Sequence, residues 1–387
     1  MQEREESTEL TMFGGPLHRL GLRLKLVRGE ANSTLLGLVL GLGLWSILAI
    51  LVHIAGAADR LFSLTAIAAD LRLLVVIPLL FLCESVLAPR MREFVATIAR
   101  SGVVRLSDLP LLQAELARAR RWTDSWLPDA FCLLIGVALS FLASGMNLSG
   151  NTAAFEPRPA MAETHLASWW YWYVCLPLFR FLILRWIWRI AIWSFFLWRL
   201  SKLDLDLSPI HPDHAGGLGY LEVVQTHFVL LTLAASILMS ASLAEDMASG
   251  EAEFDEILPA LALNLVAQIM LICLPTCVFL LKLKACQMKG LSDYTTLAAS
   301  YVYAFEKKWI KRRADLTEPL LGTPDLQSLS DLSSSVGIIR NMRWIPVSMR
   351  LLLIVAVAAL SPMTPLLLFK YPAGELTRRL FSKLVGL

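Results

Sequence analysis

The chain has 387 residues, of which 56% are hydrophobic and 17% charged, and its mean hydropathy is +0.61. Soluble domains carry about 25% charged residues, so this composition excludes an ordinary soluble fold. The formal net charge of +3 gives no electrostatic footprint for nucleic acid, and we expect no nucleic-acid partner. Several apolar runs approach the roughly 20 residues that cross a bilayer. We therefore predict an all-α, polytopic transmembrane helix bundle of six or seven spans in a lipid bilayer.

Residues 1–33 form a polar leader ahead of the first apolar run. The leader contains five lysine or arginine residues and five glutamates. It is too long and too acidic for the basic region of a signal peptide, so we expect the first span to be retained. We interpret the leader as a cytoplasmic N-terminal segment.

Seven apolar segments are candidates for membrane spans. They cover residues 34–56, 71–88, 127–146, 169–199, 226–245, 257–281 and 346–369. Lysine and arginine accumulate in cytoplasmic loops, so their distribution predicts the orientation. The leader has five, loop 89–126 has seven and loop 282–345 has ten, whereas the three loops between have one, one and none. This alternation places the N-terminus in the cytoplasm and holds through six spans, which form a bundle over residues 34–281.

Both basic loops contain patterns typical of amphipathic helices. In loop 89–126, Ser107 or Asp108 starts a helix in the segment LSDLPLLQAELARARRW. In loop 282–345, we predict a second amphipathic helix over the segment YTTLAASYVYAFEKKWIKRR. Its basic end, residues 307–313, is either a solvated helix end or a contact for anionic lipid headgroups.

Residues 346–387 combine the last span with an amphipathic tail. Pro362 and Pro365 cannot continue the helical hydrogen-bond ladder without a kink or a break. Either the span crosses with a kink or it turns back, and we favour the kinked crossing, which places the tail outside. The tail ELTRRLFSKLVGL presents leucines on one stripe, as an interfacial helix does. These are Leu376, Leu380, Leu384 and Leu387.

The fourth predicted span carries arginines at depths where charge is costly. Aromatic residues from Trp169 to Tyr173 form a belt typical of the outer interface. At a rise of about 1.5 Å per residue, Arg180, Arg185 and Arg189 then lie within the hydrocarbon. An arginine at this depth costs several kcal/mol and cannot lose its proton. Each must therefore meet a carboxylate, a carbonyl group or a water-filled cavity.

The arrangement of acids around these arginines leaves three interpretations. Glu84, in the second span, lies at a depth similar to Arg185 or Arg189, and Asp129 lies near the inner start of the third span. The side chains form buried ion pairs, line a polar pathway for an anion or a proton, or snorkel to the inner headgroups, most readily Arg189. If the protein conducts an ion, three arginines against one well-placed glutamate favour an anion as that ion. The five acids of loop 246–256 favour a cation instead.

The segment LDLDLSPIHPDHAGGLGYLE, residues 203–222, gathers polar groups before the fifth span. His211, Asp213 and His214 are candidate ligands for a divalent metal, because imidazole and carboxylate suit zinc and similar ions. The spacing H-x-D-H is too tight for all three side chains to reach one ion easily. A divalent metal is therefore one of several interpretations of this segment, and we expect no other cofactor.

The alternatives for the same segment need no metal. A helix that starts at Pro212 or Asp213 lets the Asp213 carboxylate bond the amides of Ala215 or Gly216. In that case the glycines form a packing notch for a neighbouring helix or for an aromatic side chain. These glycines are Gly216, Gly217 and Gly219. A phosphate cradle and a pH-sensing role for the two histidines are further alternatives.

The second half of the chain is similar to a family of uncharacterised bacterial polytopic inner-membrane proteins. The segments that carry the resemblance are HPDHAGGLGYL, FEKKW, LLGTPDLQSLSDL, IIRNMRWIPV and LSPMTPLLL, within residues 200–370. The resemblance implies a bacterial inner-membrane location. It implies no reaction and no functional residue.

The intramembrane arginines make a channel or transporter for a small ion the first functional hypothesis. A membrane-embedded scaffold or sensor with a cytoplasmic metal- or partner-binding site is the alternative. An enzyme is disfavoured, because no catalytic motif or catalytic residue stands out. The small residues of LLGLVLGLGLW favour a homo-oligomer.

Overall fold

The computed structural model describes residues 16–23, 33–58, 61, 63, 66–145, 165–250, 252, 254–311 and 324–370. Over these ranges the chain is an all-α bundle, which confirms the predicted fold class. The β pairing found there is one isolated bridge, between Val104 and Leu205.

The helices follow one another with α-helical, π-helical and 3-10 segments joined end to end. In chain order they are α2 (Pro16–Arg23), α3 (Thr34–Ile54), α4 (Ile67–Leu71), η2 (Arg72–Val76), α5 (Ile77–Arg100), η3 (Leu106–Asp108), α6 (Leu109–Asp124), α7 (Trp126–Gly145), α8 (His165–Trp170), η6 (Tyr171–Cys175), α9 (Leu176–Leu200), α10 (Tyr220–His227), α11 (Val229–Ser249), α12 (Phe254–Cys273), η7 (Leu274–Phe279), α13 (Leu280–Phe305), η8 (Glu306–Ile310), α14 (Pro324–Arg340), α15 (Met349–Leu360), η10 (Ser361–Leu366) and α16 (Leu367–Lys370).

Five helical runs among the described residues are long and apolar enough to cross a membrane. They are Thr34–Ile54, Ile67–Arg100, Tyr220–Ala248, Phe254–Ile310 and Met349–Leu366. The pair α6 and α7, bent by 44°, makes a sixth if it is counted as one span. Helix α9, which carries four arginines, is not among them. The structure is thus consistent with a multi-pass membrane protein of five or six apolar spans.

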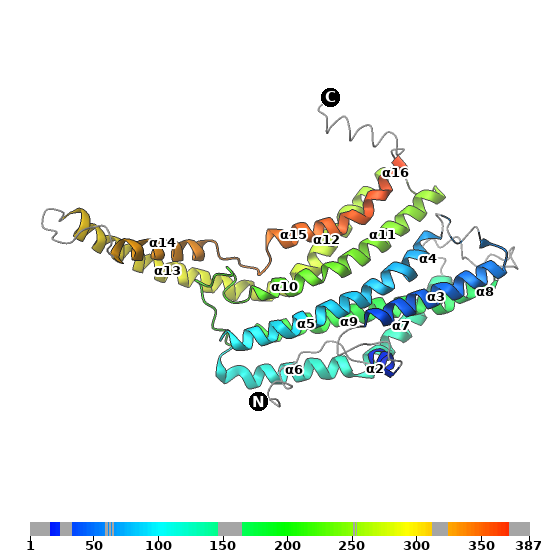
Figure 1. Cartoon of the computed structure of the whole chain (residues 1–387), viewed down its shortest axis with the longest axis horizontal. Helices are drawn as coiled ribbons and strands as arrows, with labels where there is room; N and C mark the ends of the chain where they lie inside the picture. Colours follow the sequence, from blue (N-terminus) through cyan, green and yellow to red (C-terminus); the bar gives the residue numbers. More distant parts are fainter. Residues whose placement is uncertain are drawn as a thin grey trace, which may run out of the picture.

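The apolar helices lie side by side, and a helical hairpin projects from one end of the bundle (Figure 1). Helix α9 packs against α7 and α6, while α5 packs against α3, α10 and α11. The centre is aromatic and aliphatic, with Phe94 of α5 edge-on to Trp193 of α9 at a centroid distance of 5.8 Å. Both side chains are fully buried. The two helices that carry the predicted buried charges are therefore central elements of the bundle.

The helix predicted in loop 282–345 is present over residues 294–310, as part of a longer helical run. Helices α12, η7 and α13 form one continuous run, and the predicted second helix is its C-terminal part. Pro275 does not break the run, because it lies at the start of the 3-10 segment η7. Helix α14 folds back along α13 (Figure 1). The change from apolar to polar residues thus marks no helix end.

Loop 89–126 is also more helical than its apolar boundaries indicate. Helix α5 continues past Pro89 to Arg100. Helix α6 then begins at Leu109 with Asp108 as its N-cap, one of the two start residues predicted. Its Glu115 forms a salt bridge with Arg199 at the end of α9, at 2.6 Å. The loop is therefore tied to the arginine-bearing helix.

The last apolar helix changes type at the two predicted prolines. Helix α15 ends at Leu360, and the 3-10 segment η10 contains both Pro362 and Pro365. The Ser240 hydroxyl of α11 donates a hydrogen bond to the Pro362 carbonyl, at 2.6 Å. The leucine stripe of the tail lies outside the described residues.

Candidate functional site

Arg189 of α9 and Glu84 of α5 form a buried bidentate ion pair. Each guanidinium Nη atom lies 2.9 Å from one carboxylate oxygen. The two side chains are only 5% and 3% exposed. Two parallel charge-assisted hydrogen bonds are the strongest form of this contact. Because Arg189 is buried and paired, it does not snorkel to the headgroups.

Arg185 joins the same cluster and brings in Asp129 of α7. Its guanidinium lies 3.7 Å from the Asp129 carboxylate and 3.9 Å from Glu84. The cluster of Glu84, Asp129, Arg185 and Arg189, here called the buried ion-pair cluster, therefore contains two cations and two acids. Three arginines against one glutamate in the sequence predict an excess of positive charge. This cluster has no such excess, because Asp129 is its second acid. Its residues join three helices.

Arg180 lies on a different face of α9 and faces an open space. Its Nη1 donates a hydrogen bond to the Ser140 hydroxyl of α7, at 2.8 Å. It also lines a cavity of about 390 Å³, here called the arginine cavity. The lining residues come from η2, η6, α9, α11 and α12, and are Arg72, Trp172, Leu176, Phe179, Arg180, Ala235, Leu238, Met239, Ser242 and Asn264. Neither Arg185 nor Arg189 is among them.

Arg72 is a site residue that the sequence reasoning missed. Its Nη1 donates a hydrogen bond to the Tyr171 hydroxyl, at 2.6 Å. Arg72 begins the π-helical segment η2, and Tyr171 begins the π-helical segment η6. π-Helical turns are rare and frequently occur at functional sites. A signal was present, because Arg72 is a cation at the edge of the second predicted span.

A buried carboxylate lies near this pair. Glu245 of α11 is 1% exposed, and neither of its oxygens has a hydrogen-bond partner among the described residues. Arg72 is its nearby opposite charge. Beyond it, Asn264 donates to the Ser236 hydroxyl at 3.3 Å, and Gln268 donates to Asn264 at 3.3 Å. Polar groups thus continue from the arginine cavity along the interface of α11 and α12.

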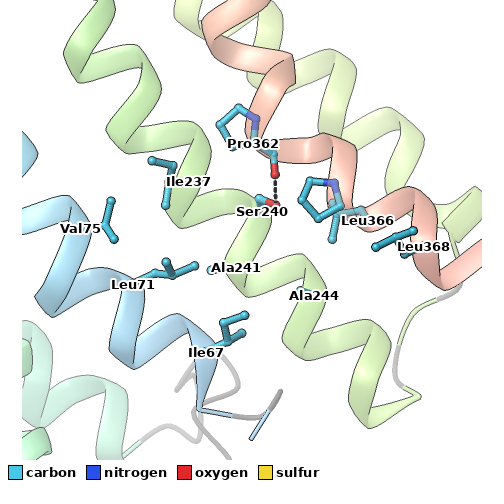
Figure 2. Close-up of a pocket in the computed structure, with 11 residues that line it drawn as sticks. Ile67, Leu71, Val75, Ile237, Ser240, Ala241, Ala244, Pro362, Leu366 and Leu368 are labelled. Carbon is cyan, nitrogen blue, oxygen red and sulfur yellow. Dashed lines mark hydrogen bonds between the residues drawn. The ribbon is translucent and has the colours of Figure 1, made fainter. Parts of the chain in front are cut away.

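A second cavity, on the other side of α11, is apolar. Figure 2 shows its side chains converging from α4, η2, α11, η10 and α16 around a space of about 500 Å³. The residues that line it carry no charge, and the hydrogen bond from Ser240 to Pro362 crosses one wall. Helix α11 therefore separates an apolar cavity from a basic one.

The segment 203–219 is a loop that Asp213 organises. Its carboxylate accepts hydrogen bonds from the amides of Ala215, Gly217 and Gly219, at 2.8, 3.1 and 2.7 Å. His211 Nδ1 lies 2.8 Å from the same group. Burial alone raises the pKa of Asp213, but the three amides and His211 together hold it below its ordinary value.

This geometry corrects the predicted helix start. Helix α10 begins at Tyr220 with Gly219 as its N-cap, and the chain from 201 to 219 forms turns. The predicted bond from Asp213 to Ala215 is present, whereas Gly216 does not bond to that carboxylate. The short polar residues stabilise local turns instead of an early helix.

Of the three glycines predicted to form a packing notch, Gly216 lies against a neighbouring helix, because a Cβ on it would lie 3.3 Å from Leu283 of α13. A Cβ on Gly217 would lie 2.6 Å from Val103, and one on Gly219 would lie 2.6 Å from the Asp213 side chain. Gly216 and Gly217 also have positive φ angles of 66° and 98°. Their small size and left-handed backbone serve the tight turn around Asp213.

Arg343 joins this loop to the segment before α15. Its amide donates to the His214 carbonyl at 2.7 Å, and its guanidinium donates to the Asp213 carbonyl at 2.9 Å. The guanidinium also forms a salt bridge with Glu222, at 2.6 Å. The segments HPDHAGGLGYL and IIRNMRWIPV therefore meet in space.

The described residues contain no group of three or more His, Cys, Asp or Glu side chains arranged for a metal ion. The structure therefore adds no support to a metal site at His211, Asp213 and His214, and that site stays a prediction.

Comparison of the chain with protein-family models, curated proteins and solved structures finds no match. The fold is an all-α helical bundle, and its apolar helices are consistent with a multi-pass membrane protein.

Proposed function

We propose that the protein is a channel or carrier that moves a small ion across a bacterial inner membrane. The observation that supports this most directly is the arginine cavity, where Arg72 and Arg180 line an open space inside an apolar bundle. Ionisable side chains within membrane spans are rare and typically mark ion or substrate pathways. A cavity of this size gives such side chains water or a ligand to solvate them.

Arg185 and Arg189 have a supporting part in this proposal. Through Glu84 and Asp129 they fix α9 against α5 and α7. Helix α9 also carries Arg180, so the same contacts hold one wall of the arginine cavity in place. This division assigns transport contacts to Arg180 and structural contacts to the buried ion-pair cluster.

Reconstitution into liposomes tests the function. We expect wild-type protein to conduct at least one of chloride, acetate, benzoate, sodium or potassium above the rate of empty liposomes. Arg180→Gln should lower that flux at least tenfold, because it removes the charge that faces the cavity. Arg90→Gln is the control, since Arg90 is 44% exposed and pairs with Glu93 outside the cavity. Equal flux in wild type, Arg180→Gln and empty liposomes contradicts the proposal.

The proposed orientation places the N-terminus and the basic loops in the cytoplasm. We also propose a homo-oligomer, supported by the apolar outer face of α3, where Leu38, Leu42 and Ile50 are exposed. A monomer mass in native mass spectrometry contradicts the oligomer.

The α13–α14 hairpin favours a second candidate, a membrane-embedded scaffold or sensor. The hairpin projects from the bundle (Figure 1). Its exposed apolar side chains include Leu297, Tyr303 and Leu326. Hydrogen exchange in native membranes and in the purified protein separates the two functions. Protection of the hairpin that disappears on purification supports a bound partner, and equal protection argues against one.

A further inference from the structure

We propose that the arginine cavity binds an organic monoanion, a carboxylate attached to a small apolar body. This proposal deepens the transport function above and rests on it for its biological role. It is carried by the charge, the shape and the lining of the cavity.

The charge of the cavity favours an anion. Arg72 and Arg180 stay protonated at any physiological pH. Their hydrogen-bond partners are the neutral hydroxyls of Tyr171 and Ser140. In the described part of the chain, neither guanidinium forms a salt bridge, in contrast to Arg185 and Arg189. The two arginines are therefore the basic groups of the bundle that a ligand can neutralise.

Glu245 limits the charge that a ligand can bring. Its carboxyl group is buried near Arg72, and neither of its oxygens has a hydrogen-bond partner among the described residues. A second anionic group on the ligand would lie inside an apolar bundle, close to this unsolvated carboxyl group, which is costly. A monoanion avoids that cost.

The size and the walls favour an organic ligand over a bare halide. A volume of about 390 Å³ lies in the range of small-molecule sites. Trp172, Phe179, Leu238 and Met239 provide apolar and aromatic walls. The polar groups Ser242 and Asn264 lie on the facing helices α11 and α12. A planar carboxylate matches the fork of a guanidinium, and an apolar body matches the rest of the lining.

Calorimetric titration of the full-length protein in phosphatidylcholine nanodiscs tests the proposal. The probes are benzoate, its neutral counterpart benzamide, and acetate, which lacks the apolar body. We expect saturable binding of benzoate that is at least tenfold tighter than that of either other probe. Benzamide binding as tight as benzoate binding overturns the proposal, because it shows that the charge is not recognised.

Three variants locate the site. Arg72→Gln and Arg180→Gln should each weaken benzoate binding at least tenfold, and the control Arg90→Gln should leave it unchanged. Ala235→Phe fills the cavity from an exposed position on α11, so it should abolish binding without removing a charge or a core contact. Wild-type affinity in Ala235→Phe overturns the proposal even where an arginine variant fails to fold.

A lipid headgroup offers the same anionic chemistry, and the bilayer composition separates the two sources. Loss of benzoate binding in phosphatidylglycerol nanodiscs, with binding intact in phosphatidylcholine, assigns the cavity to lipid and overturns the proposal. The outcome for transport is distinct. Benzoate binding without flux refutes the transport function alone, and sodium flux without benzoate binding refutes this inference alone.

Discussion

At the scale of single residues, the Arg189–Glu84 pair gives the sharpest expectation for stability. Because both side chains are buried, Glu84→Gln leaves the positive charge of Arg189 without this partner. The substitution should lower the free energy of unfolding by about 3–5 kcal/mol. The double variant Glu84→Gln with Arg189→Met removes both charges and should recover part of that loss. Thermal unfolding followed by tryptophan fluorescence in detergent measures the order wild type, double variant, single variant.

The matched control for this pair is exposed. Arg90 and Glu93 form an i,i+3 salt bridge with side chains 44% and 47% exposed. Glu93→Gln should change stability by less than about 1 kcal/mol, because surface pairs are well solvated. A loss in Glu93→Gln as large as in Glu84→Gln contradicts the structural weight given to the buried ion-pair cluster.

Asp213 predicts a pH dependence at the same scale. Its pKa is lowered from the ordinary value of 3.8, so ionised Asp213 stabilises the folded state above that value. This stabilisation is lost as the pH falls through the lowered pKa. Asp213→Ala should therefore make the loop 203–219 more susceptible to proteolysis at pH 7, and the difference from wild type should shrink below about pH 4. A constant difference at all pH values contradicts this role, and Asp204→Ala, at an exposed site, is the control.

At the scale of elements, one acidic side chain joins the two helices of the α13–α14 hairpin at the N-terminal end of α14. Asp325, at the start of α14, accepts hydrogen bonds from Lys308 and from the Trp309 indole, both at 3.0 Å. These bonds hold the pKa of Asp325 below its ordinary value. Asp325→Asn should speed amide exchange over residues 324–340 at neutral pH, with the bundle unchanged. Exchange equal to that of wild type contradicts this role of Asp325 and leaves the other contacts, such as those of Gln287 with the Ile339 and Arg340 carbonyls, to hold the hairpin.

The sequence predicted the apolar helices well and their ends poorly. A run of apolar residues is a local signal, so α3 and α15 fall where hydropathy indicates. Helix continuation past Pro89, and across Pro275 into a polar segment, depends on packing that hydropathy does not record. The turn around Asp213 was misplaced for a related reason. Its amide bonds reach two to six residues along the chain, and a cap pattern describes only the nearest of them.

The site was predicted in part, for a reason visible in two residues. Glu84 was matched to Arg185 or Arg189 because depth along straight spans is calculable from a constant rise. Asp129 was left unmatched, since its meeting with Arg185 depends on which helices are neighbours. Arg72 was missed because its partner, Tyr171, lies 99 residues away in another π-helical segment. The depth of a residue can be calculated from one span alone, whereas its neighbours depend on how all the helices of the bundle pack.

At the scale of the whole molecule, the two ends of the bundle should face opposite sides of the membrane. The C-terminal end of α11 and the α13–α14 hairpin lie at opposite ends of the structure (Figure 1). Residues 246–256, where α11 ends and α12 begins, contain five acids and no lysine or arginine, whereas residues 282–345 contain ten basic residues. This asymmetry predicts that the hairpin is cytoplasmic and that the α11 end is outside.

Single cysteines at exposed positions measure this orientation directly. The six native cysteines are replaced first, and Ala248→Cys on α11 or Ser334→Cys on α14 is then added. A membrane-impermeant maleimide should label Ala248→Cys in intact cells, and Ser334→Cys only after the membrane is opened. The reverse pattern inverts the proposed orientation. Labelling of both from outside would mean that the bundle does not cross the membrane between them, because a spanning bundle presents its opposite ends to different compartments.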